Sequence, residues 1–206
     1  MSASAPPIQQ LSVVDVAVSV AGHELFSNIS LSLNSGRVLA LHGGNGVGKT
    51  TLLRVLAGLH RDYTGTFVYS PGVTVGFASG SVSMLYEDLS LNENVALISN
   101  KSFTPLLLSP ELCARPIKNF SNGERALAAF ERMWVMRPTV ILMDEITAPL
   151  DQKRRTELFE AVKTHAKLGG SAIFVSHEEL PADLATERLV LTAAGLSGIE
   201  LGGSLA

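Results

Sequence analysis

Residues 42–51 of the chain read HGGNGVGKTT, in which four glycines precede a lysine and two threonines. Glycine loses more conformational freedom on folding than any other residue, so such a cluster indicates that the fold needs backbone without side chains here. Gly43, Gly48, Lys49 and Thr50 occupy the fixed positions of the pattern G-x-x-x-x-G-K-[ST]. Successive N–H groups of such a loop point inward around phosphate oxygens, so the stretch predicts a phosphate-binding loop.

The residues on either side of the loop favour this interpretation over an ordinary glycine turn into a helix. RVLALH at 37–42 is typical of a strand buried on both faces, and TTLLRVLAGL at 50–59 has helical spacing. A helix that begins near Lys49 directs its positive dipole end at the phosphates. We expect Lys49 to bridge the β- and γ-phosphates, the Thr50 hydroxyl to bind Mg²⁺, and Thr51 to reach the α-phosphate. The residues expected to contact the nucleotide are Gly43, Gly44, Asn45, Gly46, Val47, Gly48, Lys49, Thr50 and Thr51.

A second group of candidate residues follows two other apolar runs. VILMDE at 140–145 places Asp144 at the carboxyl end of a buried strand, the edge at which ligands bind in parallel sheets. Asp144 is the candidate magnesium anchor, and Glu145 is the candidate general base that polarises attacking water. SAIFVSH at 171–177 ends in His177, which we expect to donate a hydrogen bond to the γ-phosphate. An acidic strand end or a lone histidine is by itself more often structural, but the phosphate loop makes both functional candidates.

The elements that must position these side chains alternate along the chain. Period-two alternation predicts two strands within residues 14–33. Apolar runs predict buried strands at 37–42, 139–144 and 171–175. Helices are expected at 50–59, from Ser121 to a stop before Pro138, and at 152–167. Shorter strands are expected near 66–69, 73–77, 188–191 and 197–201, and short helices in LSLNENVALI, in SPELCA and near 178–186. Alternating buried strands and helices predict an α/β fold with a mainly parallel sheet.

With these motifs in this order, the chain resembles the ATP-binding cassette (ABC) family over most of its length. GGNGVGKTT looks like the family's Walker A loop and VILMDE like its Walker B strand, while FSNGE, APLD and VSH resemble the signature, the D-loop and the switch-histidine loop. The resemblance implies a P-loop NTPase fold: a single ABC nucleotide-binding domain over residues 11–206, with a mainly parallel sheet, an N-terminal antiparallel β subdomain and a short helical subdomain at 80–136. Residues 1–10 are expected to be a loose leader.

The resemblance also implies a partner for the signature segment. Taken alone, S-x-x-E at 121–124 is a capping box that begins a helix. In the family this cap faces the γ-phosphate held by a second cassette, so Ser121 and Gly123 are expected to contact nucleotide across a head-to-tail homodimer. ATP and Mg²⁺ are the implied cofactors. Hydrolysis is expected because Lys49, Thr50, Asp144, Glu145 and His177 are all present.

Two expected side chains of the family pattern are missing. The Q-loop glutamine should fall near Gly80, where the sequence has none, and Ser79 and Ser81 are alternative substitutes. The aromatic residue that stacks on adenine should fall near Val20, but residues 11–25 contain no Phe, Tyr or Trp, and His23 is a poor replacement. Since base stacking contributes roughly 1–3 kcal/mol, we expect modest ATP affinity.

The signature segment departs from the family pattern at two positions. Asn122 replaces a glycine, and Glu124 replaces a glutamine. At about 10 Å and an effective dielectric near ~20, the Glu124 charge is expected to repel a triphosphate by roughly 1–2 kcal/mol. Hydrolysis is therefore expected to be slow.

Within the family, the closest resemblance is to the ATP-binding subunits of cytochrome c maturation heme exporters, carried by residues 23–59. It implies a peripheral subunit at the cytoplasmic face of the bacterial inner membrane, which powers integral membrane subunits and the release of heme. Two alternatives stay open: the ATPase of another ABC transporter, and a weakly hydrolysing nucleotide-gated scaffold.

The composition fits these expectations. The net charge of −3 gives no basic excess for nucleic acid, and we expect none as a partner. No apolar run approaches the ~18 residues that a membrane span needs. Charged residues make up only 17% of the chain, so either the core is large or apolar surface is hidden against a partner. Cys113 is the only cysteine, which excludes disulfides within the chain, and we expect it to be a small buried hydrophobe.

Overall fold

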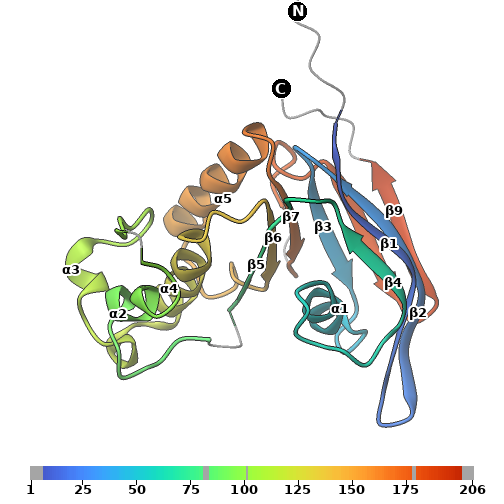
Figure 1. Cartoon of the computed structure of the whole chain (residues 1–206), viewed down its shortest axis with the longest axis horizontal. Coiled ribbons are helices and arrows are strands. Elements are labelled where there is room, and N and C mark those ends of the chain that lie inside the picture. The colour runs from blue at the N-terminus through green and yellow to red at the C-terminus, as the bar shows by residue number, and fades with distance from the viewer. Residues whose placement is uncertain (1–6, 81–83, 101, 178–179, 201–206) are drawn as a thin grey trace, which may run out of the picture.

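We analysed a computed structural model, which describes residues 7–80, 84–100, 102–177 and 180–200. In this part of the chain two β-sheets are present, and Figure 1 shows how they are arranged. The larger sheet has the strand order β5-β6-β7-β3-β8-β9, in which β9 pairs antiparallel to β8 and the other pairs are parallel. Its strands are β3 (Val38–Gly43), β5 (Val75–Ser79), β6 (Val140–Asp144), β7 (Ser171–Val175), β8 (Glu187–Thr192) and β9 (Gly195–Glu200).

The smaller sheet is antiparallel and has the order β2-β1-β4. Its strands are β1 (Gln9–Val20), β2 (His23–Asn34) and β4 (Thr64–Tyr69). The predicted architecture, an α/β domain with a mainly parallel sheet and an N-terminal antiparallel sheet, is confirmed.

The helices lie on or beside the larger sheet. They are α1 (Lys49–Leu56), α2 (Leu91–Ala96), α3 (Pro110–Cys113), α4 (Asn122–Trp134) and α5 (Gln152–Lys167), with one 3₁₀ turn, η1 (Ile117–Asn119). In Figure 1, α2, α3 and α4 form a group at the left, away from the antiparallel sheet. These helices fall within residues 80–136, the range expected for a helical subdomain.

Alternation along the central strands explains why the sheet is buried on both faces. In β6, Ile141 and Met143 pack in one hydrophobic cluster with α4 and α5, whereas Val140 and Leu142 pack in a second cluster with α1 and the antiparallel sheet. β3 and β7 alternate in the same way. Each central strand therefore separates two cores.

Two expectations about local structure were wrong. Strand β1 begins at Gln9, so the expected loose leader is too long. Gln10 is buried because its amide donates to the carbonyl of Gly169 at 2.8 Å and accepts from the Ser171 hydroxyl at 2.5 Å. The helix expected near 178–186 is a turn in its described part, residues 180–186, whose Leu184 and Ala185 pack in the core. Residues 1–6 and 178–179 lie outside the described residues.

Cys113 is a small buried side chain, as predicted from the sequence. It is fully buried at the end of α3, and the pKa of its thiol is raised to about 11, chiefly by burial and then by the nearby Glu131 and Glu111 carboxylates.

Candidate nucleotide-binding site

The predicted phosphate loop connects β3 to α1, and its two ends leave no room for side chains. Gly43 has φ 150°, and a Cβ there would lie 2.5 Å from the carbonyl oxygen of Leu191. Gly48 has φ 101°, and a Cβ there would lie 2.7 Å from the ring of Phe26. Positive φ and close packing both require glycine, so the loop presents bare backbone at the start of α1.

Lys49 holds this loop from the inside. Its Nζ donates to the carbonyls of Gly43 at 2.9 Å and Gly44 at 3.0 Å, and only 6% of the residue is exposed. The ammonium group thus lies within the loop, beside the N-terminus of α1, where backbone amides favour an anion. The arrangement is chemically suited to a phosphate chain.

The structure brings Thr50 and Asp144 into direct contact. The Thr50 hydroxyl donates to Oδ1 of Asp144 at 2.9 Å, and the Ser79 hydroxyl donates to Oδ2 at 3.2 Å. Asp144 is fully buried. Burial is the main cause that raises the pKa of Asp144, and the two hydroxyl hydrogen bonds oppose it. A hydroxyl and a carboxylate are hard oxygen ligands, so these residues fit the donor set that Mg²⁺ prefers.

Glu145 and His177 also meet, although they come from different strand ends. His177 Nε2 lies 2.9 Å from Glu145 Oε1, and the two side chains are 52% and 34% exposed. Glu145 has φ 51°, and its backbone N–H donates to the carbonyl of Val175 at 3.0 Å. The left-handed conformation turns the carboxylate out of β6 into a partly open position, where it can reach water. Strained backbone of this kind clusters at functional sites.

The signature residues are placed at the start of α4. Ser121 is the N-cap: its hydroxyl accepts from the backbone N–H of Glu124 at 3.3 Å, and its own N–H donates to Glu124 Oε2 at 2.8 Å. The predicted capping box is confirmed. A Cβ on Gly123 would lie 2.8 Å from the carbonyl oxygen of Pro149, so the signature segment packs closely on the D-loop. Asn122, Pro149 and Glu145 line one polar pocket of about 600 Å³.

The charge of Glu124 is not isolated. Its Oε1 lies 3.5 Å from a guanidinium nitrogen of Arg154 on α5. The backbone hydrogen bond from Ser121 is the largest cause that lowers the pKa of Glu124, and Arg154 adds to it. The carboxylate is therefore held by its own chain and partly neutralised.

The structure places several of the residues at the positions where the family's glutamine and aromatic side chains are missing. Of the two serines near Gly80, Ser79 contacts Asp144, whereas Ser81 lies outside the described residues. Val20 and His23 pair at the end of the β1–β2 hairpin, and both are exposed.

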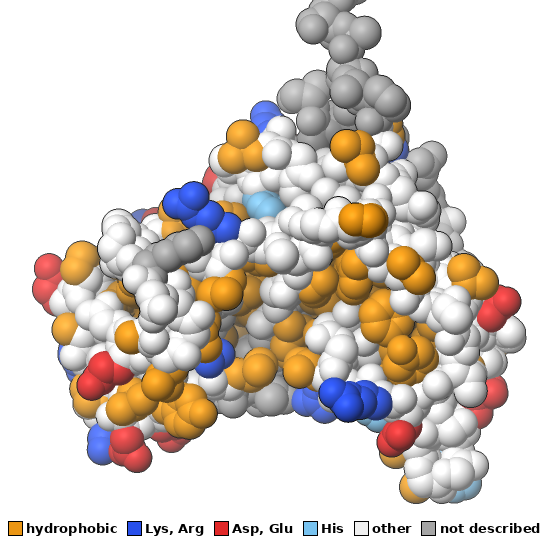
Figure 2. Space-filling view, in the orientation of Figure 1, with side chains coloured by type: hydrophobic (Ala, Val, Ile, Leu, Met, Phe, Trp, Pro, Cys, Tyr) orange, Lys and Arg blue, Asp and Glu red, His pale blue; other side chains and the backbone are white. Residues whose placement is uncertain are grey.

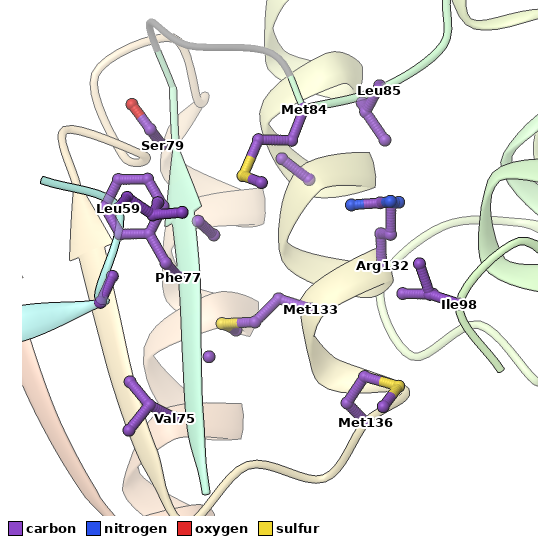
Figure 3. Close-up of a pocket in the computed structure, with 14 residues that line it drawn as sticks. Leu59, Val75, Phe77, Ser79, Met84, Leu85, Ile98, Arg132, Met133 and Met136 are labelled. Atoms are coloured by element: carbon purple, nitrogen blue, oxygen red, sulfur yellow. The ribbon is translucent and has the colours of Figure 1, made fainter. Parts of the chain in front are cut away.

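An apolar pocket next to the site was not predicted from the sequence. It has a volume of about 230 Å³ and lies along β5 and α4, with Ser79 at its margin. Figure 3 shows Leu59 and Phe77 on one side and Met84 and Met136 on the other. Figure 2 shows hydrophobic side chains in the hollow between the helical and the strand-rich parts of the molecule. Nothing in the spacing of its methionines distinguishes them from core residues, so only the fold reveals it.

Among the described residues, no helix is long and apolar enough to cross a membrane.

Comparison with known proteins gives a consistent result. The profile of the ABC transporter family matches residues 26–148. The cytochrome c biogenesis ATP-binding export protein CcmA of Ruegeria pomeroyi is 32% identical over 180 residues, which cover 84% of this chain and 87% of that protein. The maltose/maltodextrin import ATP-binding protein MalK of Aliivibrio fischeri is 29% identical over 88% of this chain, which spans 55% of its length. The zinc import ATP-binding protein ZnuC of Buchnera aphidicola is 26% identical over 83% of this chain and 75% of its own.

Solved structures show the same fold. An ATP-binding cassette in a dimeric post-hydrolysis state with ADP and Pi superposes with a TM-score of 0.81 at 17% identity, covering 94% of this chain and 99% of that chain. A putative metal-chelate type transporter in an inward-facing conformation gives a TM-score of 0.75 at 23% identity, covering 94% and 84%.

Proposed function

Because the chain belongs to the ABC transporter family, and is an ATPase coupled to transmembrane transport, we propose that residues 43–51 bind the phosphates of ATP and that Thr50 and Asp144 hold Mg²⁺. The observation that carries this proposal is the 2.9 Å contact between the Thr50 hydroxyl and Asp144, at the mouth of a loop that encloses the Lys49 ammonium group. Both oxygen groups then lie where a metal bound to the phosphates needs ligands.

In the proposed reaction, Glu145 polarises the attacking water and His177 orients the γ-phosphate by a hydrogen bond. The contact between His177 and Glu145 supports this pairing, because it keeps an acceptor and a donor side by side at the carboxyl ends of adjacent strands. When bound, Mg²⁺ supplies positive charge to the phosphate oxygens.

The proposed working unit is a homodimer. Ser121 and Gly123 would contact the nucleotide of a second copy, and the dimeric cassette that shares this fold supports that arrangement. The capping box also supports it, since it fixes the start of α4, where Ser121 and Asn122 are exposed.

The proposed partners are integral membrane subunits, with this chain peripheral at the cytoplasmic face of the bacterial inner membrane. We assign the apolar pocket along β5 and α4 to a segment of such a subunit. Ser79 lines this pocket and also contacts Asp144, so a partner there would lie next to the nucleotide site. The relatives' names, which describe import and export proteins, agree with this role.

The specific transport process we propose is heme export or release in cytochrome c biogenesis. Its support is the 32% identity to the CcmA protein over nearly the whole length of both chains. The similar identities of maltose and zinc import proteins favour a second candidate, the ATPase of another transporter.

Replacing Lys49 with alanine tests nucleotide binding. The variant loses the ammonium group inside the loop, so ATP affinity measured by calorimetry with Mg²⁺ should fall at least about tenfold, as expected for a charge-assisted contact. Lys153→Ala, which removes an 85% exposed lysine on α5, is the matched control and should bind like wild type. Equal affinity of both variants would refute the proposed site.

Co-purification tests the partners. Expressed together with candidate membrane subunits, the wild-type chain should be recovered in the membrane fraction. Met136→Asp, in the apolar pocket, should weaken that recovery, whereas Leu168→Asp, at an 83% exposed residue elsewhere, should not. Recovery of heme-handling subunits supports the cytochrome c assignment, and recovery of a different permease replaces it with the second candidate.

A further inference from the structure

Asp144 is the most completely held carboxylate of the nucleotide site. Each of its two oxygens accepts a hydroxyl: Thr50 donates to Oδ1 from α1 and Ser79 donates to Oδ2 from β5. The two donors come from different elements, both far from Asp144 in the sequence, and Asp144 has no exposed surface. The plane of the carboxylate is therefore fixed by two separate hydrogen bonds.

Strand pairing explains why Ser79 reaches this position. β5 and β6 are parallel neighbours, and Ser79 is the register partner of Asp144 at their carboxyl ends. Paired residues in a sheet direct their side chains to the same face. A further backbone hydrogen bond links the two strand ends: the Gly80 N–H donates to the carbonyl oxygen of Asp144 at 2.9 Å.

Gly80 cannot supply a side chain of its own. A Cβ at Gly80 would lie 2.7 Å from the carbonyl oxygen of Glu145, closer than real Cβ contacts allow. The end of β5 is thus pressed against the backbone of Asp144 and Glu145, and the hydroxyl of Ser79 is the polar side-chain group that this strand end directs at the carboxylate.

We propose that Ser79 is a positioning residue for magnesium: it holds Oδ2 of Asp144 so that the carboxylate is presented to the ion in one orientation. This inference rests on the proposed function, in which Thr50 and Asp144 hold Mg²⁺. Thr50 is itself a proposed ligand, whereas Ser79 acts only through Asp144.

The chemistry of the ion explains why such a contact matters. Mg²⁺ demands near-ideal octahedral geometry and tolerates little freedom in its ligands. Carboxylates that serve metals are commonly held by outer hydrogen bonds, and removing such a partner typically lowers metal affinity or activity about 10- to 100-fold.

The test measures how much Mg²⁺ strengthens nucleotide binding. The affinity for a non-hydrolysable ATP analogue is determined by calorimetry in EDTA and again in saturating Mg²⁺, and the ratio of the two dissociation constants is the metal-dependent gain. Ser79→Ala should reduce this gain about tenfold while the affinity in EDTA stays at the wild-type value. Ser79→Thr keeps the hydroxyl and should keep the gain.

A buried hydroxyl elsewhere in the same sheet provides the control. Ser171 is fully buried at the start of β7, and its hydroxyl donates to Gln10. Ser171→Ala should lower the melting temperature but leave the metal-dependent gain unchanged, which separates loss of a buried hydrogen bond from loss of metal positioning.

Three outcomes decide the matter. A reduced gain in Ser79→Ala that Ser79→Thr restores supports the inference. A wild-type gain in Ser79→Ala, or an equal loss in both variants, overturns it while leaving the nucleotide site intact. If the wild-type chain shows no gain from Mg²⁺ at all, the proposed magnesium site itself fails, and this inference fails with it.

Discussion

His177 Nε2 and Glu145 Oε1 lie 2.9 Å apart, although 31 residues separate them in the sequence. Glu145 directly follows β6 and His177 lies two residues beyond the end of β7, and the two strands are paired so that Asp144 lies beside Val175. The pairing of these strands, together with the left-handed backbone of Glu145, brings the two side chains together. A carboxylate that is two-thirds covered and held by a histidine is well placed to act on water.

Replacing Glu145 with glutamine should therefore separate binding from turnover. The amide keeps the shape of the side chain but cannot accept a proton, so phosphate release should fall about 10²- to 10⁴-fold while ATP affinity is retained. The variant should also accumulate as an ATP-bound dimer in size-exclusion chromatography. Glu157→Gln, on the outer part of α5, is the control and should release phosphate at the wild-type rate. Equal rates for wild type and Glu145→Gln would favour the non-hydrolysing scaffold.

The strand–loop–helix unit around Lys49 could be predicted from the sequence because all of its determinants are local. An apolar run, a glycine cluster and a helical repeat follow one another within residues 37–59, and the structure has β3, the loop and α1 in the same order. Asp144 and His177 could also be predicted from local sequence, since Asp144 ends one short apolar strand and His177 lies two residues beyond the end of another.

The contacts between these units could not be predicted in the same way, because they depend on strand order. Ser79 meets Asp144 only because β5 pairs with β6, an arrangement that the sequence of either strand does not specify. The same reason explains why the sequence predicts Gln10 to lie in a loose leader: its burial depends on contacts with Gly169 and Ser171, which are distant in sequence.

Glu124 offers a test of how the signature helix is stabilised. Glu124→Ala should lower the free energy of unfolding by about 1 kcal/mol, because the Ser121 N–H loses the Glu124 carboxylate as its acceptor in the capping box. Glu124→Gln keeps an oxygen acceptor for the Ser121 N–H and should lose less. Since Arg154 already offsets the charge, the glutamine variant should change ATP affinity by less than about threefold.

Urea denaturation and calorimetry on the two variants check this prediction. A large gain in ATP affinity in Glu124→Gln would show instead that the carboxylate repels nucleotide despite its contact with Arg154.

Introducing glutamine at Gly80 should impair the protein, even though the family resemblance implies glutamine near this position. The new Cβ would lie 2.7 Å from the Glu145 carbonyl oxygen, so the backbone of Asp144 and Glu145 must shift. A shift at a catalytic pair reduces turnover strongly, so kcat should fall at least about tenfold. Gly72→Gln is the control for replacing a glycine by glutamine. Gly72 lies in an open turn with φ 81°, so this variant should lose stability but keep the wild-type kcat. A Gly80→Gln variant with raised kcat would show that the strand end can accommodate the side chain.

Glu131 gives a prediction about pH that does not involve the nucleotide. This carboxylate on α4 is 1% exposed, and its Oε1 accepts the backbone N–H groups of Leu106 at 2.7 Å, Leu107 at 2.5 Å and Leu108 at 3.3 Å. Burial is the largest influence and raises the pKa of Glu131, while the three N–H groups oppose it. A carboxyl whose pKa is raised by folding contributes stability below its unfolded pKa and loses that contribution as the pH rises through its folded pKa.

Glu131→Gln keeps the acceptor oxygen but does not titrate. Its stability relative to wild type should therefore improve as the pH rises from about 4 to about 7, because only the wild-type chain must bury a charge at the higher pH. Glu131→Ala should be less stable at every pH, by about 1–3 kcal/mol, since it removes the acceptor of three backbone N–H groups, of which that of Leu108 is buried. Urea denaturation of the three proteins at several pH values measures both effects. A constant difference between wild type and Glu131→Gln across this range would mean that the carboxylate is as well stabilised by the three N–H groups as it is by water.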